Sequence, residues 1–308
     1  MRILVAGAAG FLGSHLVRRL LAEGCQVAIL TRADSSMWRI ADILPSVRVM
    51  QSDLLNLTGV GETLREFAPQ VVVHLAWQGV GHRYRNDPKG VSNLQATLNL
   101  LELGRQVGCT SWVGLGSQAE YGVWNRAINE ETPTTPTTLY GATKLCACFL
   151  TQQFCMQAGM RFVWLRLFSA YGPADNREWL IPYVILTLLH GEMPALTEGT
   201  QNWDYLYVED AVRAIYQTIV SQDANGIYNL GSGVTRTVRT VVEQIRDLID
   251  PRLPLGFGQV PFRTDQIVHL QADISRLQGL GWSPEVKFEN GLQRTVDWFK
   301  ENPGRFAP

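Results

Sequence analysis

A tyrosine and a lysine near the middle of the chain have the types and spacing of an acid/base pair. Tyr140 and Lys144 are four residues apart, so on a helix their side chains lie on one face. An ammonium beside a phenol lowers the pKa of the phenol toward the range in which it can exchange a proton with a substrate. The same spacing is common on solvated helices, so this pair alone does not decide between catalysis and surface charge.

Three glycines near the N-terminus have the spacing of a phosphate-binding turn. Gly7, Gly10 and Gly13 follow an apolar run and open a segment with helical periodicity. The first two allow a tight turn and a close approach of the backbone to a pyrophosphate, and the third lets the helix pack on the strand. Free N–H groups at the helix N-terminus attract the anion. We therefore predict a dinucleotide site, with a glycine-rich turn that holds no ligand as the alternative.

The elements that must position these residues follow a regular alternation. Short runs rich in Val, Ile and Leu predict buried strands, and segments with apolar residues at helical spacing predict helices between them. Strands are expected at 3–6, 26–31, 47–50, 71–75, 111–115 and 162–168, and helices at 11–23, 58–67, 86–107 and 139–158. This βαβ order predicts an α/β protein with a Rossmann-type, doubly wound parallel sheet.

The pattern loosens after residue 170, where Pro and Gly become frequent. We expect an NAD(P)-binding Rossmann domain at 1–170 and a smaller α/β substrate-binding region at 171–308, with a segment at about 203–230 that crosses back. A strand is expected at 227–230 and a helix at 238–248, with Thr235 or Thr237 as its N-cap.

Composition excludes several classes of function. The 308 residues are 46% hydrophobic, and 27 Lys+Arg against 28 Asp+Glu give a net charge of −1, so neither nucleic acid nor an anionic membrane is expected as a partner. Five cysteines without a CxxC pair or a neighbouring histidine predict neither disulfides nor a metal site, and favour a reducing cytoplasm. The longest apolar stretch, 180–189, contains Pro182 and is far below the roughly 20 residues of a membrane span.

Further short segments, in order along the chain, resemble one protein family. They are His74-Leu-Ala76, Ser117-Gln-Ala-Glu-Tyr-Gly122, Arg166-Leu-Phe-Ser-Ala-Tyr-Gly-Pro173, Tyr205-Leu-Tyr-Val-Glu-Asp210, Tyr228-Asn-Leu-Gly-Ser-Gly233, Arg263-Thr-Asp265, Ala272-Asp-Ile-Ser-Arg276 and Leu280-Gly-Trp282. Together with the glycine spacing and the Tyr/Lys pair, they resemble the extended short-chain dehydrogenase/reductase family of nucleotide-sugar epimerases, dehydratases and reductases. The resemblance covers nearly the whole chain.

The resemblance implies roles for individual residues. Ser117 and Tyr140 would bind and protonate the substrate oxygen, and Lys144 would hold the nicotinamide ribose. The expected cofactor contacts are Gly7, Ala9, Gly10, Phe11, Leu12, Gly13, Thr31, Arg32, Asp53, Leu54, Leu75, Ala76, Trp77, Asn93, Tyr140, Lys144 and Phe168. The expected substrate contacts are Trp77, Ser117, Gln118, Ser169, Trp203 and Arg263. The resemblance also implies a homodimer formed through helices at 93–107 and 139–158.

Departures from the family pattern narrow these expectations. Thr31 and Arg32 stand where NAD-binding members carry an acid, which favours NADP while leaving NAD open. Gln118 and Ala119 stand where dehydratases carry the Asp-Glu pair that eliminates water. Ser169 and Trp203 replace a usual Asn and Arg, and this leaves Arg263 as the candidate for the substrate diphosphate.

These observations predict NADPH-dependent reduction of a nucleotide-diphosphate 4-keto-(6-deoxy)hexose. An NAD-dependent nucleotide-sugar 4-epimerase is the alternative, because the same three residues, Ser117, Tyr140 and Lys144, can serve the oxidation of C4 and the return of the hydride. A third reading, a non-catalytic dinucleotide sensor, would not need the intact Ser/Tyr/Lys set. Trp77 and residues 82–85 follow the fourth expected strand, where they either line the sugar pocket or form a solvated loop.

Overall fold

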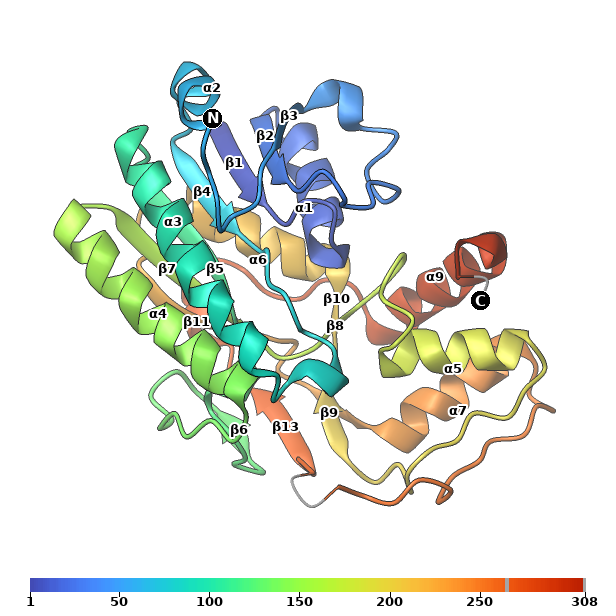
Figure 1. Cartoon of the computed structure of the whole chain (residues 1–308). Helices are drawn as coiled ribbons and strands as arrows, with labels where there is room; N and C mark the ends of the chain where they lie inside the picture. The colour runs from blue at the N-terminus through green and yellow to red at the C-terminus, as the bar shows by residue number, and fades with distance from the viewer. Residues whose placement is uncertain (264–265, 307–308) are drawn as a thin grey trace.

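A seven-stranded parallel sheet lies at the centre of the computed structural model, which describes residues 1–263 and 266–306 (Figure 1). The strands are β1 (Arg2–Ala6), β2 (Gln26–Thr31), β3 (Arg48–Gln51), β4 (Val71–His74), β5 (Ser111–Ser117), β7 (Arg161–Leu167) and β11 (Gly226–Leu230). Their order is β3-β2-β1-β4-β5-β7-β11, and all neighbours are parallel. The order reverses between β1 and β4, where ligands bind in open α/β sheets.

Helices cover both faces of this sheet. One face carries α1 (Phe11–Ala22) and α6 (Val208–Val220), and the other carries α2 (Gly61–Phe67), α3 (Ser92–Gln106) and α4 (Leu139–Ala158) (Figure 1). Alternate side chains of one strand enter different cores, because Ile3 and Val5 pack with the first set of helices and Leu4 packs with the second. The predicted doubly wound parallel sheet is confirmed.

Several predicted boundaries are wrong, and local capping explains the start of α3. Helix α3 begins at Ser92 instead of residue 86, because the Asp87 side chain accepts from the Lys89 amide at 2.9 Å and caps the 3-10 turn η3 (Pro88–Val91). Helix α2 begins at Gly61 instead of residue 58, and β5 extends two residues further, to Ser117. Thr237 caps α7 (Val238–Ile249), whereas Thr235 lies in a strand.

Smaller elements lie beyond the carboxyl ends of the central strands (Figure 1). One sheet has the order β12-β9-β13-β6, and β8 pairs with β10. The bounds are β6 (Ala127–Ile128), β8 (Ala170–Tyr171), β9 (Asn202–Asp204), β10 (Leu206–Tyr207), β12 (Thr235–Thr237), β13 (His269–Ala272), α5 (Leu180–Leu189), α8 (Ser275–Gly279) and α9 (Phe288–Glu301), with 3-10 turns η1 (Leu44–Ser46), η2 (His82–Tyr84), η4 (Gln118–Glu120) and η5 (Pro303–Phe306). Within the described ranges, no helix has the length and apolarity that a membrane span requires.

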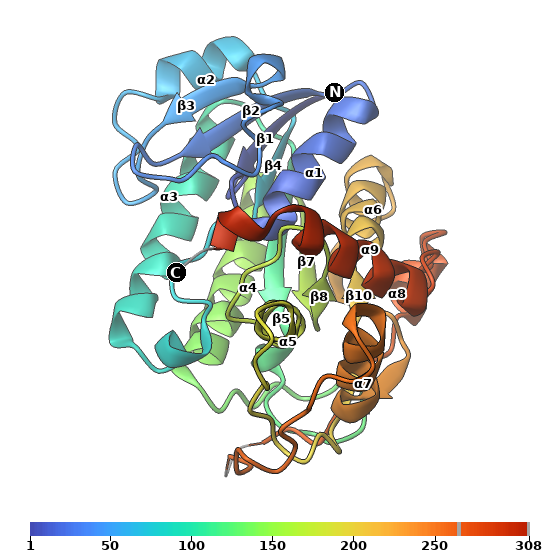
Figure 2. The same ribbon diagram turned by 90° about the vertical axis from the view of Figure 1, so that its right-hand side faces the viewer.

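Helix α9 connects these smaller elements to the loop after β2. Figure 2 shows the helix crossing the molecule between α1 and α5. Its Trp298 stacks on Trp38 of the loop, with ring centroids 6.2 Å apart and an interplanar angle of 27°. The Arg39 guanidinium lies 4.4 Å from the centroid of the Trp38 ring. The loop that follows β2 therefore packs against the C-terminal helix.

Candidate active site

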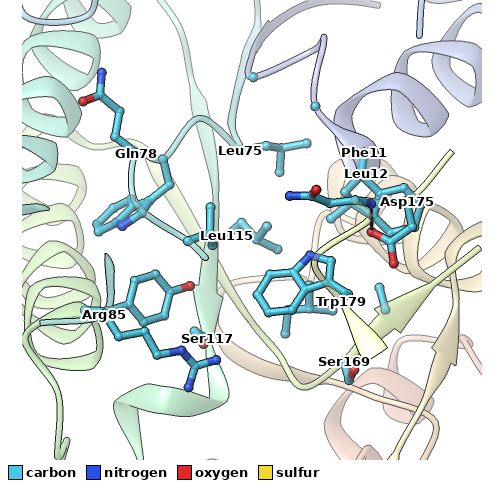
Figure 3. A pocket seen from close by; sticks show the side chains of 18 of the residues that line it. Phe11, Leu12, Leu75, Gln78, Arg85, Leu115, Ser117, Ser169, Asp175 and Trp179 are labelled. Atoms are coloured by element: carbon cyan, nitrogen blue, oxygen red, sulfur yellow. Dashed lines mark hydrogen bonds between the residues drawn. The ribbon is translucent and has the colours of Figure 1, made fainter. Parts of the chain in front are cut away.

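A cleft of about 930 Å³ lies at the carboxyl ends of the central strands (Figure 3). Every residue that the sequence predicted as a site residue lines it: Gly7, Ala9, Gly10, Phe11, Leu12, Gly13, Thr31, Arg32, Asp53, Leu54, Leu75, Ala76, Trp77, Asn93, Ser117, Gln118, Tyr140, Lys144, Phe168, Ser169, Trp203 and Arg263. These residues come from distant parts of the sequence, and the parallel sheet brings their strand ends to one edge.

The glycine turn packs so closely against neighbouring backbone that no side chain fits at Gly7 or Gly13. Gly7 has a φ of +91°, and a Cβ atom there would lie 2.5 Å from the Ala76 amide nitrogen. A Cβ at Gly13 would overlap the Gly7 carbonyl oxygen. The N-cap of α1, Gly10, supplies no side-chain hydrogen bond, and the first turn contains no acidic residue. The first-turn amides therefore suit the diphosphate of a dinucleotide.

The end of the cleft next to β2 is lined by cationic and hydroxyl side chains. Thr31, Arg32, Ser35 and Arg39 share this part of the wall. Arg32 pairs with exposed Asp34 at 3.2 Å, a contact that contributes little in water. The sequence analysis missed Arg39, and a second arginine seven residues after Arg32 was the available signal.

Arg39 is held in place by a distant loop, which also carries a buried acid. Its Nε donates to the Ala174 carbonyl at 2.9 Å. The next residue, Asp175, is buried in the wall below Phe11 (Figure 3) and accepts from the Asn176 amide at 2.7 Å. Burial raises the pKa of Asp175 to about 8, although Arg39 opposes this shift. The sequence offered no sign of this buried carboxyl group.

The first turn of α4 holds Tyr140 at the opposite wall. Thr138 caps this turn by accepting from the Gly141 amide at 3.1 Å. The Arg85 carbonyl accepts from the Tyr140 amide at 2.8 Å, and the Asn86 side chain accepts from the Leu139 amide at 3.1 Å. The loop before α3 thus fixes the helix end that presents the phenol.

Burial moves the pKa values of Tyr140 and Lys144 apart, and neighbouring groups oppose this separation. Burial raises the pKa of Tyr140, and the Ser117 hydroxyl and the Arg85 guanidinium oppose this rise. Burial lowers the pKa of Lys144 to about 7, and the Glu120 carboxylate opposes this fall. Ser117, at the end of β5, lies on the same cleft wall. The raised pKa of Tyr140 is opposite to the fall predicted from its spacing with Lys144, so the phenol is protonated near neutral pH and can donate its proton to a substrate oxygen.

A buried ion pair supports the serine from below. Glu120 accepts from the Ser117 amide at 2.8 Å, from Arg166 Nε at 2.7 Å and from Trp164 Nε1 at 3.0 Å. Glu120 and Arg166 are both almost fully buried. The carboxylate nearest to Ser117 in the sequence is therefore committed to the core and does not line the cleft.

The outer part of the cleft is largely apolar. Trp203 and Trp179 line it together with Ser169, and Figure 3 shows Trp179 across the cleft from Ser117. The buried side-chain oxygen of Gln118 has no hydrogen-bond partner in the described residues. The sequence analysis missed Trp179, which is the N-cap residue of α5.

The loop after β4 was predicted either to line the sugar pocket or to be solvated, and its residues do both. Arg85 lines the cleft, whereas Arg83 pairs with Glu178 at 2.7 Å in solvent and Tyr84 is exposed. The side chain of His82 lies outside the described residues, as do Thr264 and Asp265 of the segment that begins at Arg263. In the parts of the chain described here, no group of three or more His, Cys, Asp or Glu side chains could hold a metal ion.

Comparison with known proteins adds four findings. The sequence model of the NAD dependent epimerase/dehydratase family matches residues 3–231. The dTDP-glucose 4,6-dehydratase of Mycolicibacterium smegmatis is 30% identical over 322 residues, which cover 100% of this chain and 96% of the relative. The UDP-glucose 4-epimerase of Thermus thermophilus in complex with NAD superposes with a TM-score of 0.89 at 29% identity, over 98% of this chain and 100% of that one. The dTDP-glucose 4,6-dehydratase of Streptomyces venezuelae, with NAD and TYD bound, superposes with a TM-score of 0.91 at 26% identity, over 100% and 99% of the two chains.

Proposed function

The chain belongs to the NAD-dependent epimerase/dehydratase family, and on that premise we propose that it reduces the 4-keto group of a nucleotide-diphosphate (6-deoxy)hexose with NADPH. The named relatives act on nucleotide sugars, and this chain matches them along almost its whole length. The reaction itself is inferred from the residues of the cleft.

In this mechanism the proton comes from the chain and the hydride from the dinucleotide. Tyr140 donates its proton to the carbonyl oxygen, and Ser117 donates a hydrogen bond to the same oxygen. Lys144 holds the nicotinamide ribose and, as a cation, favours the phenolate that Tyr140 leaves behind. The glycine turn and the first turn of α1 hold the diphosphate. When bound, the cofactor supplies a hydride to C4.

The single observation that carries the choice of reaction is the set of acids in the cleft. Among the described residues, the acidic side chains that line it are Asp53 and Asp175, both on the nucleotide side. Glu120 is buried in an ion pair, and Gln118 and Ala119 carry no charge. Water elimination at a sugar carbon needs a carboxylic acid and a base next to the substrate. This composition supports carbonyl reduction over dehydration.

The proposed preference for NADP rests on the wall beside β2. The related structures hold NAD, but Arg32, Ser35 and Arg39 provide donors for an additional phosphate in this chain. Arginine binds phosphate through short, charge-assisted hydrogen bonds. Thr31 stands in place of an acid that would repel that phosphate.

The second candidate is a nucleotide-sugar 4-epimerase with NAD. It is favoured by the 29% identity to the epimerase of Thermus thermophilus and by the fact that the same three residues serve oxidation and reduction at C4. The two reactions differ in whether the cofactor is consumed.

We also propose a cytoplasmic homodimer. The five free thiols suit a reducing compartment. On α4, Phe149, Leu150 and Met156 are exposed apolar side chains on the helix that the family resemblance assigns to the subunit interface.

A panel of UDP-, dTDP-, CDP- and GDP-linked 4-keto-6-deoxyhexoses, each mixed with NADPH or NADH, tests the proposal. We expect one sugar to consume NADPH and to yield a 4-hydroxy product. The corresponding 4-hydroxy nucleotide sugars, each mixed with NAD⁺, test the alternative: interconversion of their C4 epimers without net change in the cofactor would establish the epimerase. Binding of dinucleotide with no turnover of any sugar would favour the sensor.

A further inference from the structure

The ammonium of Lys144 is buried between a backbone carbonyl and an indole ring. The side chain is 4% exposed, and its Nζ donates to the Leu115 carbonyl at 2.6 Å. The centroid of the Trp77 ring lies 3.6 Å from the same nitrogen. An ammonium has three N–H donors. One therefore points to the carbonyl and another direction is covered by the indole face.

Trp77 is itself fixed by the segment that follows β4. The Asn93 side chain accepts from the Gln78 amide at 2.9 Å and donates to the Gln78 carbonyl at 3.1 Å. These two bonds hold the backbone next to the indole. The Trp77 ring also meets the Tyr140 ring edge-on, with centroids 6.4 Å apart. The indole thus contacts both members of the Tyr/Lys pair.

We propose that Trp77 is a positioning residue whose indole face seats the Lys144 ammonium, so that the remaining N–H is directed at a ribose hydroxyl of the dinucleotide. The electron-rich face of tryptophan attracts a cation, most strongly where water is excluded. A rigid ring also removes orientations in which the ammonium would turn away from the cleft. This inference rests on the proposed function, because it takes Lys144 as the residue that holds the ribose.

The other charged and titratable groups around Lys144 do not fully offset the cost of burying its ammonium. Glu120 on η4 attracts the ammonium but is already paired with Arg166 of β7. His74 on β4 is neutral above mildly acidic pH, because burial lowers its pKa to about 3. Tyr140, on α4 itself, carries no charge near neutral pH because its pKa is raised. The indole face therefore compensates part of the cost of burying the cation.

Direct titration of Lys144 tests the proposal without any substrate. The chain has four lysines, Lys89, Lys144, Lys287 and Lys300, so lysine labelled with carbon-13 at Cε gives a spectrum of four signals. Lys144→Arg identifies the signal of interest. In Trp77→Leu, which keeps an apolar cover without a ring, we expect the pKa of Lys144 to fall by about 0.5 to 1.5 units. Trp77→Phe retains a weaker π face and should produce a smaller fall.

A matched control separates this effect from general loosening of the cleft. Trp179→Leu removes another indole from the cleft wall and should leave the Lys144 titration unchanged. Calorimetry with NADP⁺ should show about two- to tenfold weaker binding to Trp77→Leu than to the wild type, the range of one hydrogen bond.

Two results of the lysine titration would overturn the proposal. A rise in the pKa of Lys144 in Trp77→Leu would mean that the indole only excludes water, and an unchanged pKa would mean that it does not interact; either overturns the proposal. If the leucine variant does not fold, a pKa in Trp77→Phe at or above the wild-type value has the same meaning. Absence of turnover with every nucleotide sugar would instead count against the proposed function, and the lysine titration would still test Trp77.

Discussion

Tyr140 is the residue from which the proposed reaction takes its proton. Tyr140→Phe keeps the ring and removes the hydroxyl, so turnover should fall on the order of 10² to 10⁴-fold. Binding of NADP(H), measured by calorimetry, should persist because the phenol does not hold the diphosphate. Tyr216→Phe, on the outer helix α6, is the matched control and should keep wild-type turnover. Near-normal turnover in Tyr140→Phe would exclude the mechanism.

Arg32 is the residue on which the proposed cofactor preference depends most directly. Arg32→Ala should weaken NADP(H) binding by about 1.5 to 3 kcal/mol and change NAD(H) binding little, because only the former carries the extra phosphate. Arg48→Ala, an exposed arginine at the start of β3, should change neither affinity. Calorimetry that shows equal losses for both cofactors, or a wild-type protein that prefers NAD, would contradict the preference.

Asp175 predicts a pH-dependent stability in the cofactor-free protein. Its folded pKa of about 8 lies above the ordinary 3.8, so ionisation destabilises the fold once pH rises above the lower value, and the penalty is complete above the higher one. Asp175→Asn should therefore stabilise the protein by about 2 to 4 kcal/mol at a pH of about 8 and by little at a pH of about 4.5.

Urea unfolding at the two pH values measures this difference. Asp53→Asn, which alters an exposed carboxylate of the same cleft, should change stability equally and slightly at both. A gain from Asp175→Asn that is the same at both pH values would show that the carboxyl group is not the cause.

Site residues were predictable where residues close together in the sequence have a spacing typical of catalysis or phosphate binding. Tyr140 and Lys144 lie on one helix turn, and the glycines at the start of α1 occupy one loop. Arg39 and Asp175 were missed because the bond from Arg39 to the Ala174 carbonyl joins segments 135 residues apart and leaves no local pattern. The orientation of Glu120 toward Arg166 was equally hidden, since either face of a short 3-10 turn could have met the cleft.

At the scale of elements, the pair of Glu120 and Arg166 joins η4 to β7 beneath the site. Glu120→Ala leaves Arg166 buried without its carboxylate and should reduce the free energy of unfolding by about 3 to 5 kcal/mol. Urea unfolding measures the loss. Glu66→Ala, which breaks the exposed pair with Arg48, should cost less than about 1 kcal/mol. Equal losses in the two variants would mean that the buried pair does not anchor this junction.

Elements in and around the central sheet were predictable because residues close to their ends in the sequence mark where they begin and end. Helix α4 was placed correctly because Thr138 caps its start and Gly159, with a φ of +65°, ends it. The smaller sheet was not predictable in the same way. Asp204 at the end of β9 accepts from the amides of Ser232, Gly233 and Ala272, which lie in two segments far along the chain. Such junctions depend on tertiary contacts, and short strands carry little periodicity of their own.

At the scale of the whole molecule, the exposed apolar residues of α4 predict how copies of the chain associate. Phe149 and Met156 are 51% and 66% exposed and lie seven residues apart, so they share one helix face. Replacing both with glutamate should convert a dimer into a monomer in sedimentation velocity, because the charges would be buried in the contact. Val234→Glu, at another exposed apolar position, should leave the dimer intact. A wild-type protein that sediments as a monomer would contradict the proposed dimer.

The stack of Trp38 on Trp298 limits how this protein can be redesigned or diverge. The loop of residues 32–39 is the natural segment to transplant from a relative in order to exchange one cofactor for the other. In this chain the graft would also remove the aromatic partner of the C-terminal helix. A successful transplant must therefore keep position 38 aromatic or change position 298 with it. Cofactor choice and the sequence of the last helix should accordingly be inherited together, although they lie at opposite ends of the chain.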